Sequence, residues 1–324
     1  MKCGNLLKPK IVVSKCLEFD ACRYNGEMIP DVTIRNLQPF VTFIPVCPEV
    51  EIGLGTPRET IRIVEENGEN RLVQPSTRED VTEKMEQFSN DFLQMISDVD
   101  GFILKNRSPS CGTRDVKIYS SFEKAPAKGK GPGLFGGAVI KKFSHLPIEE
   151  EGRLSNFIIR EHFFTRLFTI AYYKMIKHNK NMKDLVSFQS DNKYLFMAYN
   201  QVKQKELGRI IANHKNEKIE VVFENYEKTL YELFMRTPRY TSNVNVCEHI
   251  FGYFKTKLKK QEKDHFLNLI QKYIEKKIPL SSLLAILKSW ALRFDEKYLL
   301  RQTYFEPYPE ALVEISDSGK GRDY

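Results

Sequence analysis

Three cysteines in the chain each follow a short apolar run typical of a buried strand. Cys16 comes after the run that starts at Lys10, Cys47 ends the run Pro39–Val46, and Cys111 lies in the turn after Gly101–Leu104. In an open α/β sheet, the carboxyl ends of parallel strands meet at one edge, where reactive side chains gather. We therefore expect these three thiols to converge at one sheet edge.

The spacing of the three cysteines excludes a compact zinc knuckle. They are 31 and 64 residues apart, so the fold must assemble the site. Three thiolates form an incomplete shell, which suits a metal centre with one open position better than a closed structural zinc site. Zinc and iron–sulfur remain the alternatives. In a three-cysteine [4Fe-4S] cluster, the fourth iron could act as a Lewis acid toward sulfur.

A carboxylate and a guanidinium follow Cys47 closely. Pro48 cannot donate a backbone hydrogen bond and ends the strand, which places Glu49 beside a candidate metal ligand. A carboxylate there can act as a general acid or base, although an ordinary surface acid is the alternative. Arg58 ends a glycine-rich turn, where it could bind a substrate carbonyl or phosphate, or form a structural ion pair.

The turn from Lys105 to Gly112 brings two hydroxyls, Ser108 and Ser110, next to Cys111. Such a loop can hold a thiol against a cofactor while its hydroxyls face a ligand, and a solvated loop is the alternative. Cys22 lies in a polar segment that closes with Asn25–Gly26, a strong turn signal. We expect Cys22 to be exposed and not a ligand, because no strand delivers it to the sheet edge.

The remainder of the first half predicts connecting elements. A hairpin should turn at Asn67–Gly68 within residues 62–74, and a crossover helix should run from Thr77 to about Val99. The glycine-rich segment 125–137 contains Gly131–Gly136, which formally matches a dinucleotide fingerprint. We reject that match because a linker precedes it, and we expect a loop over the site and then a last strand at Ala138–Ile140.

From Leu154 onward the pattern changes to helices with aromatic residues at helical spacing, a pattern typical of a buried core. We expect an α/β domain over residues 1–148, with a Rossmann-like, mostly parallel open sheet. An all-α helical-bundle domain should follow over residues 153–324. The helices are expected at residues 157–176, 184–212, 218–235, 244–258, 263–276 and 279–291.

Charge is unevenly distributed between the two halves. Residues 1–150 carry a net charge of −1 and residues 151–324 carry +9, which together give the net charge of +8. A basic half suggests a polyanion partner, although solvated surface is the alternative. Basic side chains stand beside aromatic ones in a segment that suits RNA. The RNA-contact candidates are Arg236, Arg239, Lys255, Lys257, Lys259 and Lys260.

No apolar run is long enough to cross a membrane, and the first residues lack a signal-peptide core. We therefore expect a cytoplasmic protein with no membrane partner. Its six cysteines are then free thiols or metal ligands rather than a disulfide framework. The sequence leaves the oligomeric state open.

Three motifs in the first half resemble those of the thiouracil desulfidase family over residues 1 to about 145. They are Ser14-Lys-Cys-Leu17, Cys47-Pro-Glu-Val with Gly53-Leu-Gly-Thr-Pro-Arg58, and Lys105 with Ser108-Pro-Ser-Cys-Gly112. The second half resembles the all-helical domain often fused to that family. That likeness rests on Asn245–Lys255, Tyr298–Gln302 and Pro307–Pro309. Together the halves resemble two-domain desulfidases that convert 4-thiouridine in tRNA to uridine.

The resemblance implies a [4Fe-4S] cluster on Cys16, Cys47 and Cys111, with substrate sulfur on the open iron and no net electron transfer. It also implies that Glu49 activates water and that Ser108 or Ser110 contacts the substrate. We place Arg58, Ser14 and Lys105 with the substrate-binding residues. A base in folded tRNA is stacked and must be extracted, which would assign RNA binding to the helical domain. The alternatives are a desulfidase of free thiouracil or another small thiocarbonyl, and a non-catalytic metal-containing RNA-binding protein.

Overall fold

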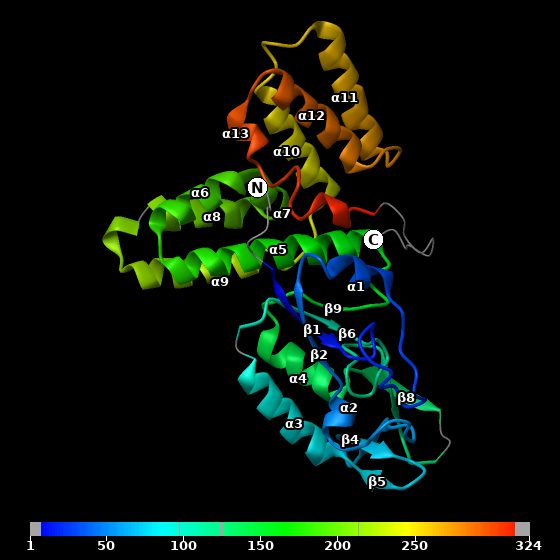
Figure 1. Cartoon of the computed structure of the whole chain (residues 1–324). Coiled ribbons are helices and arrows are strands. Elements are labelled where there is room, and N and C mark those ends of the chain that lie inside the picture. Colours follow the sequence, from blue (N-terminus) through cyan, green and yellow to red (C-terminus); the bar gives the residue numbers. More distant parts are fainter. Residues whose placement is uncertain (1–7, 97, 124–125, 213, 315–324) are drawn as a thin grey trace. The chain divides into compact units, whose positions relative to one another are not determined.

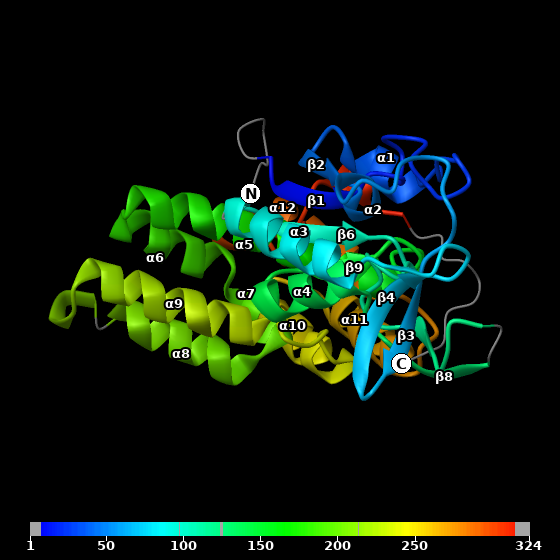
Figure 2. The same cartoon turned by 90° about the horizontal axis from the view of Figure 1, so that it is seen from below.

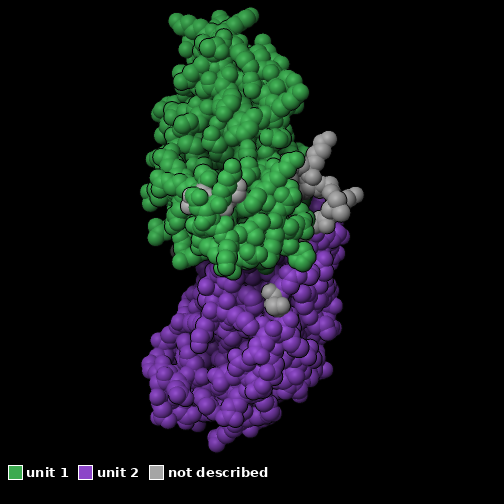
Figure 3. Space-filling view, turned by 90° about the vertical axis from the view of Figure 1, so that its left-hand side faces the viewer, with its two compact units in different colours: residues 1–6, 172–310 green, residues 7–171, 311–324 purple. Residues whose placement is uncertain are grey.

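The computed structural model describes residues 8–96, 98–123, 126–212 and 214–314. The chain forms two compact units, shown in different colours in Figure 3. We call residues 7–171 with 311–324 the α/β unit, and residues 1–6 with 172–310 the helical unit. Among the helices of the described residues, none is long and apolar enough to span a membrane.

A parallel sheet organises the α/β unit. Its strands lie in the order β2-β1-β6-β9, with bounds β1 (Lys10–Ser14), β2 (Thr42–Val46), β6 (Gly101–Leu104) and β9 (Ile148–Glu150). The apolar residues of β1 and β6 are buried on both faces, which explains their continuous apolar runs. From β1 the chain crosses to β2 on one side and returns to β6 on the other. The strand order therefore reverses next to β1, where ligands bind in open α/β sheets.

Helices connect the parallel strands. These are α1 (Val32–Leu37), α3 (Thr82–Met95) and α4 (Leu134–Phe143), and Figures 1 and 2 show how they surround the sheet. Figure 1 shows α1 on one side of the strands and the α3–α4 pair on the other. Phe135 of α4 lies against Phe88 and Phe92 of α3, with ring centroids 6.1 and 5.9 Å apart. The expected α/β class with a parallel sheet is confirmed.

A second sheet extends this unit, with strand order β5-β4-β3-β7-β8. Its strands are β3 (Arg62–Glu66), β4 (Glu69–Gln74), β5 (Glu79–Asp80), β7 (Val116–Tyr119) and β8 (Ala127–Gly131). The hairpin expected at Asn67–Gly68 is confirmed between β3 and β4. Both turn residues have positive φ, 52° and 85°, which asparagine and glycine tolerate best.

Two expectations for connecting segments need correction. The crossover helix expected from Thr77 to about Val99 is present as α3, but it begins at Thr82 because residues 79–80 continue the sheet as β5. The loop and strand expected over residues 125–140 are instead β8 and helix α4, and the last strand of the parallel sheet is β9. In α4 the buried residues Phe135, Val139 and Phe143 recur every four positions, which is helical spacing.

Helices make up the chain from residue 157, which confirms the expected helical second region. Their bounds are α5 (Phe157–Asn179), α6 (Met182–Asp191), α7 (Lys193–Tyr199), α8 (Gln201–Ala212), α9 (Ile219–Leu233), α10 (Tyr240–Gly252), α11 (Lys260–Ile274), α12 (Leu280–Arg293) and α13 (Lys297–Leu300). Short 3-10 turns lie at His214–Asn216 and Glu310–Leu312. The two compact units divide between Ala171 and Tyr172, within α5. The expected domain boundary near residues 148–153 stays a prediction.

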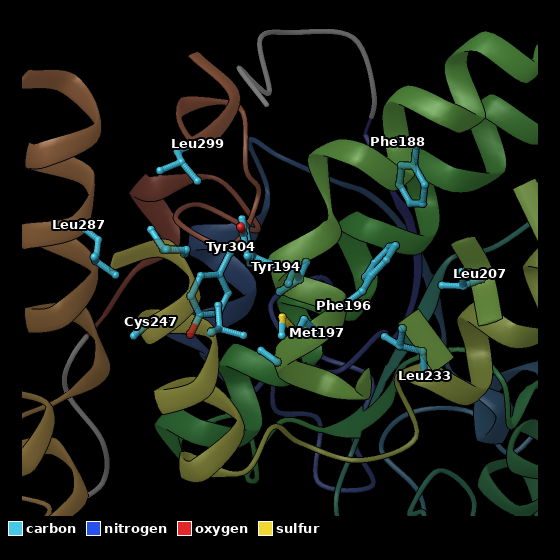
Figure 4. Packing of buried hydrophobic residues seen from close by; sticks show 14 of the residues in the cluster. Phe188, Tyr194, Phe196, Met197, Leu207, Leu233, Cys247, Leu287, Leu299 and Tyr304 are labelled. Carbon is cyan, nitrogen blue, oxygen red and sulfur yellow. The ribbon is translucent and has the colours of Figure 1, made fainter. Parts of the chain in front are cut away.

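Aromatic and aliphatic side chains together form the core of the helical unit, part of which Figure 4 shows. Tyr173, Phe188 and Tyr226 are almost fully buried, and the rings of Tyr173 and Tyr226 stack 5.4 Å apart. Cys247 is buried in the same core, next to the hydroxyl of Tyr304. Most aromatics of the second half therefore serve packing, as their helical spacing predicts.

Candidate functional site

The carboxyl ends of β1, β2 and β6 lie side by side. Ser14 pairs with Val46, and the Lys15 amide donates to the Val46 carbonyl at 2.8 Å. The Lys105 amide, just after β6, donates to Ser14 Oγ at 2.9 Å. This register brings the segments that carry Cys16, Cys47 and Cys111 to one edge of the sheet, which we call the thiol edge. The assignment of these cysteines as metal ligands stays a prediction.

The three thiols sit in a poorly solvated environment and affect one another. Burial, then nearby Cys47 and Glu49, raises the pKa of Cys16 to about 12. Burial also raises the pKa of Cys47, and raises that of the fully buried Cys111 well above its usual range. Burial therefore disfavours the thiolate form of these cysteines, and a positively charged metal group would favour it.

The donor set fits an iron–sulfur cluster better than a single ion. Within the described residues, no group of three or more His, Cys, Asp or Glu side chains is arranged to hold one metal ion. A cluster is different because each cysteine binds a different iron, so its ligands need not surround one point. Three cysteine thiols around a shared edge are the ligands that such a cluster uses.

Glu49 is the centre of a hydrogen-bond network at the thiol edge. It lies in the short helix α2 (Pro48–Glu51), directly after Cys47. Its Oε2 accepts a hydrogen bond from Arg58 Nε at 3.0 Å and a second one from Arg58 Nη2. The side chain of Arg58 is only 4% exposed and that of Glu49 13%. The ion pair considered for Arg58 from the sequence is therefore present, and it fixes the carboxylate.

Two hydroxyls bind the other oxygen of Glu49. Ser110 Oγ donates to Oε1 at 2.5 Å, and Ser108 Oγ lies 3.3 Å from the same atom. Ser108 Oγ also accepts from the Cys111 amide at 3.1 Å. Ser110 is fully buried, whereas Ser108 is half-buried. Of the two serines, Ser108 is therefore the one that a substrate can reach without rearrangement.

Two acidic residues at the end of β9 hold the loop that carries Cys111. Glu150 Oε1 accepts from the Thr113 amide at 2.6 Å and from its hydroxyl at 2.9 Å. Glu151 accepts from the Asn106 amide at 2.7 Å and pairs with Lys105 Nζ. Both carboxylates are buried, so they fix both ends of the loop. Sequence patterns did not identify these residues, because an acidic run usually indicates solvent-exposed surface.

Helix α4 holds the middle of the same loop. The amides of Gly133, Leu134 and Gly136 donate to carbonyls of residues 109–112 at 2.8, 3.1 and 2.9 Å. These are amides without partners inside the helix, and the loop satisfies them. A Cβ on Gly136 would lie 2.2 Å from the Gly112 carbonyl oxygen. The glycines of the rejected dinucleotide match therefore allow backbone to approach backbone.

We expect Gly136→Ala to destabilise the α/β unit by about 1–3 kcal/mol, the usual cost of overpacking. The new methyl group would clash with the backbone of the Cys111 loop. Urea denaturation measures the change. Gly137→Ala is the matched control, since its Cβ would meet only Pro132 at 3.4 Å. Equal unfolding midpoints for the two variants would show that the close approach of Gly136 to the Gly112 carbonyl does not affect stability.

The expectation that Cys22 is exposed is wrong. It is 4% exposed and lies against Cys47, whose Sγ is 3.8 Å from the Cys22 carbonyl oxygen. Burial, then Cys47, raises the pKa of Cys22 to about 12. Arg58 holds this segment in place by donating to the Cys22 carbonyl at 2.9 Å. Cys22 is held in this buried position by Arg58, which lies 36 residues later in the chain, and local turn signals do not reveal such a contact.

Ser14 and Lys105, the other residues assigned to substrate binding from the sequence, both lie at the thiol edge. Ser14 is buried, and its hydroxyl joins the ends of β1 and β6 and lies against the Cys111 thiol. Lys105 Nζ is held by Glu151 and Asn106. Their roles in substrate binding stay predictions.

The six RNA-contact candidates belong to the helical unit and flank α10. All are exposed, and we call them the basic cluster; they are Arg236, Arg239, Lys255, Lys257, Lys259 and Lys260. Lys257 pairs with Glu296, whereas the others form no ion pair within the described part of the chain. Tyr240 and Tyr253, which are 53% and 38% exposed, stand among them.

Comparison with known proteins matches both halves of the chain. Residues 11–151 match the 2-thiouracil desulfurase family, and residues 193–309 match a family described as a protein of unknown function (DUF1722). The uncharacterized protein YbbK of Bacillus subtilis (strain 168) is 36% identical over 147 residues, which cover 43% of this chain and 95% of YbbK. The uncharacterized protein YbgA of Escherichia coli (strain K12) is 24% identical over 156 residues, which cover 48% of this chain and 92% of YbgA.

One solved structure is also similar, with 28% identity and a TM-score of 0.36. It is described as the [4Fe-4S]-dependent thiouracil desulfidase TudS, and the match covers 45% of this chain and 93% of that one. The fold and the thiol edge define an α/β protein with a buried cysteine site at the switch point of a parallel sheet. Through that unit the chain belongs to the 2-thiouracil desulfurase family of enzymes.

Proposed function

We propose that the protein removes sulfur from 4-thiouridine in tRNA and gives uridine. The observation that carries this proposal is the meeting of three cysteines, two of them buried and one half-buried, with the Glu49–Ser108–Ser110 network at one sheet edge. Membership of the desulfurase family supports a thiolated nucleobase as the substrate class and favours an enzyme over a non-catalytic RNA-binding protein.

Cys16, Cys47 and Cys111 would hold a [4Fe-4S] cluster. When bound, the cluster would supply a Lewis-acidic iron that takes the sulfur of a thiocarbonyl. The protein shields Cys47 and Cys111 from water because both are buried, whereas Cys16 is half-buried. Cys16 therefore marks the side from which a substrate reaches the site.

Glu49 would take a proton from the attacking water. Arg58 holds one carboxylate oxygen, which leaves Oε1 to exchange its serine partners for water. Ser108 can then turn its hydroxyl toward the substrate nucleobase, because Ser108 is half-buried and its Oγ already lies within reach of Glu49 Oε1. The proton that Glu49 takes can pass to the leaving sulfur, so the carboxylate ends as it began.

The helical unit would bind the RNA. Its basic cluster combines exposed cationic side chains with the exposed rings of Tyr240 and Tyr253. Cations bind phosphates, and exposed aromatic rings stack on unpaired bases. A base in tRNA must leave its stack before water can attack it, which requires the RNA to be held elsewhere on the protein.

The test compares two substrates under anaerobic conditions, after reconstitution with iron and sulfide. We expect the reconstituted protein to deplete 4-thiouridine in bulk tRNA, measured by nucleoside mass spectrometry after digestion. Free 2-thiouracil is the second candidate substrate, which the family name favours. Turnover of free thiouracil without any change in tRNA would replace the tRNA proposal with that alternative.

Neutralising part of the basic cluster should weaken tRNA binding. We expect Arg236→Gln with Arg239→Gln to lower the slope of log affinity against log salt by about 1 for each phosphate that the variant no longer neutralises. Fluorescence anisotropy with labelled tRNA measures the slope, and turnover of a free thiobase should not change. Lys272→Gln with Lys276→Gln removes two exposed charges outside the cluster as a control. An equal reduction of the slope in the two double variants would mean that only the overall charge of the protein affects tRNA binding.

A further inference from the structure

Cys22 is buried, although most of the segment that carries it is exposed. Ala21 and residues 24–28 are exposed, whereas Cys22 is 4% exposed. The turn around it is held by hydrogen bonds, since the Gly26 amide donates to the Arg23 carbonyl at 2.9 Å and the Arg58 amide to the Tyr24 carbonyl at 2.8 Å. A small apolar residue would fill such a space equally well, so the neighbours of Cys22 decide its role.

Those neighbours are the thiols of the thiol edge. The Cys47 Sγ lies 3.8 Å from the Cys22 carbonyl oxygen. Cys47 and Cys16 are also close enough to the Cys22 thiol to add to the effect of burial in raising its pKa. Arg58 donates from Nη1 to the same Cys22 carbonyl while its Nε donates to Glu49. The guanidinium thus joins the segment that carries Cys22 to the carboxylate proposed for the reaction.

We propose that Cys22 is a fourth, exchangeable cluster ligand that occupies the open iron position when no substrate is bound. This inference rests on the proposed function, because it requires the cluster on Cys16, Cys47 and Cys111. Cys22 would lose its thiol proton to solvent as its sulfur binds the iron. When a thiocarbonyl sulfur displaces it, Cys22 takes a proton back, and no electrons are transferred in either direction.

The exchange would protect the resting protein. An iron with an open side is readily removed from a cluster, because solvent and oxidants reach it there. Cys22 lies on a short turn rather than on a strand, so rotation of its side chain can release the iron while its backbone carbonyl keeps its contacts with Arg58 and Cys47.

The experiment compares the reconstituted full chain with Cys22→Ser and Cys22→Ala. Each sample is prepared anaerobically and then exposed to air. Decay of the cluster absorbance is followed, and electron paramagnetic resonance measures the [3Fe-4S] species after mild oxidation. We expect both variants to lose the cluster about tenfold faster than wild type and to give more [3Fe-4S] signal. Cys247→Ala, which changes a buried thiol of the helical unit, should behave as wild type.

Three results overturn the proposal in distinguishable ways. If wild type holds iron and sulfide but the Cys22 variants decay and oxidise as it does, Cys22 is not a ligand and the proposed function stands. If wild type takes up no iron and sulfide, the proposed function fails and this inference fails with it. If the variants decay faster but the melting temperature of the cluster-free chain also falls, and the [3Fe-4S] yield is unchanged, the effect is one of packing.

Discussion

Glu49→Gln should lower the rate of desulfidation by about 10²–10⁴-fold while the iron and sulfide content stays unchanged, because an amide cannot take a proton from water. The amide oxygen can still accept from Arg58 while the amide NH2 donates to Ser110 Oγ, so the loop around Cys111 should keep its position. Single-turnover kinetics with anaerobically reconstituted protein, together with iron and sulfide assays, measure both quantities.

The matched control for Glu49 is Glu51→Gln. Glu51 lies in the same short helix and is exposed, so its replacement removes an equal charge without touching the network. We expect its rate to stay within about twofold of wild type, as for most surface substitutions. A Glu49→Gln protein that keeps its rate would show that Glu49 only anchors Ser108 and Ser110.

Cys111→Ala should abolish both the cluster and the activity. Cys111 is the thiol that the β6 loop supplies, and Ser108, Glu150 and α4 fix that loop through hydrogen bonds. Of the other cysteines near the thiol edge, Cys16 and Cys22 follow β1 and Cys47 follows β2, so none of them can replace Cys111 from the same side. Iron and sulfide per chain after reconstitution give the direct measurement.

Cys247→Ala again provides the comparison for Cys111→Ala, since Cys247 is buried in the helical unit. It should retain the cluster in full, although burial makes some loss of folding stability expected. A Cys111→Ala chain with normal iron content would exclude Cys111 as a ligand. The unfolding midpoints of both variants separate cluster loss from a general failure to fold.

The sequence predicted the elements whose signals are local. Strands β1 and β6 are short apolar runs that turn residues end, and Asn67–Gly68 has the backbone preferences of a hairpin. The long helices of the second half show helical spacing of large aromatic residues.

Features that depend on contacts between distant segments could not be predicted in this way. Cys22 is buried because Arg58 and Cys47 hold its segment, although the segment itself reads as an exposed turn. Helix α4 was missed because glycine and proline usually indicate a loop, whereas here glycine lets the helix approach the Cys111 loop. Glu150 and Glu151 face inward only because the loop after β6 offers them amide donors.

The central claim is that this protein replaces the sulfur of 4-thiouridine in tRNA with oxygen from water. The most direct measurement incubates the anaerobically reconstituted protein with bulk tRNA in water enriched in heavy oxygen and analyses the nucleosides by mass spectrometry. We predict that 4-thiouridine disappears and that an equal amount of uridine carries one heavy oxygen atom. Unchanged 4-thiouridine, or uridine formed without the label, would contradict the claim.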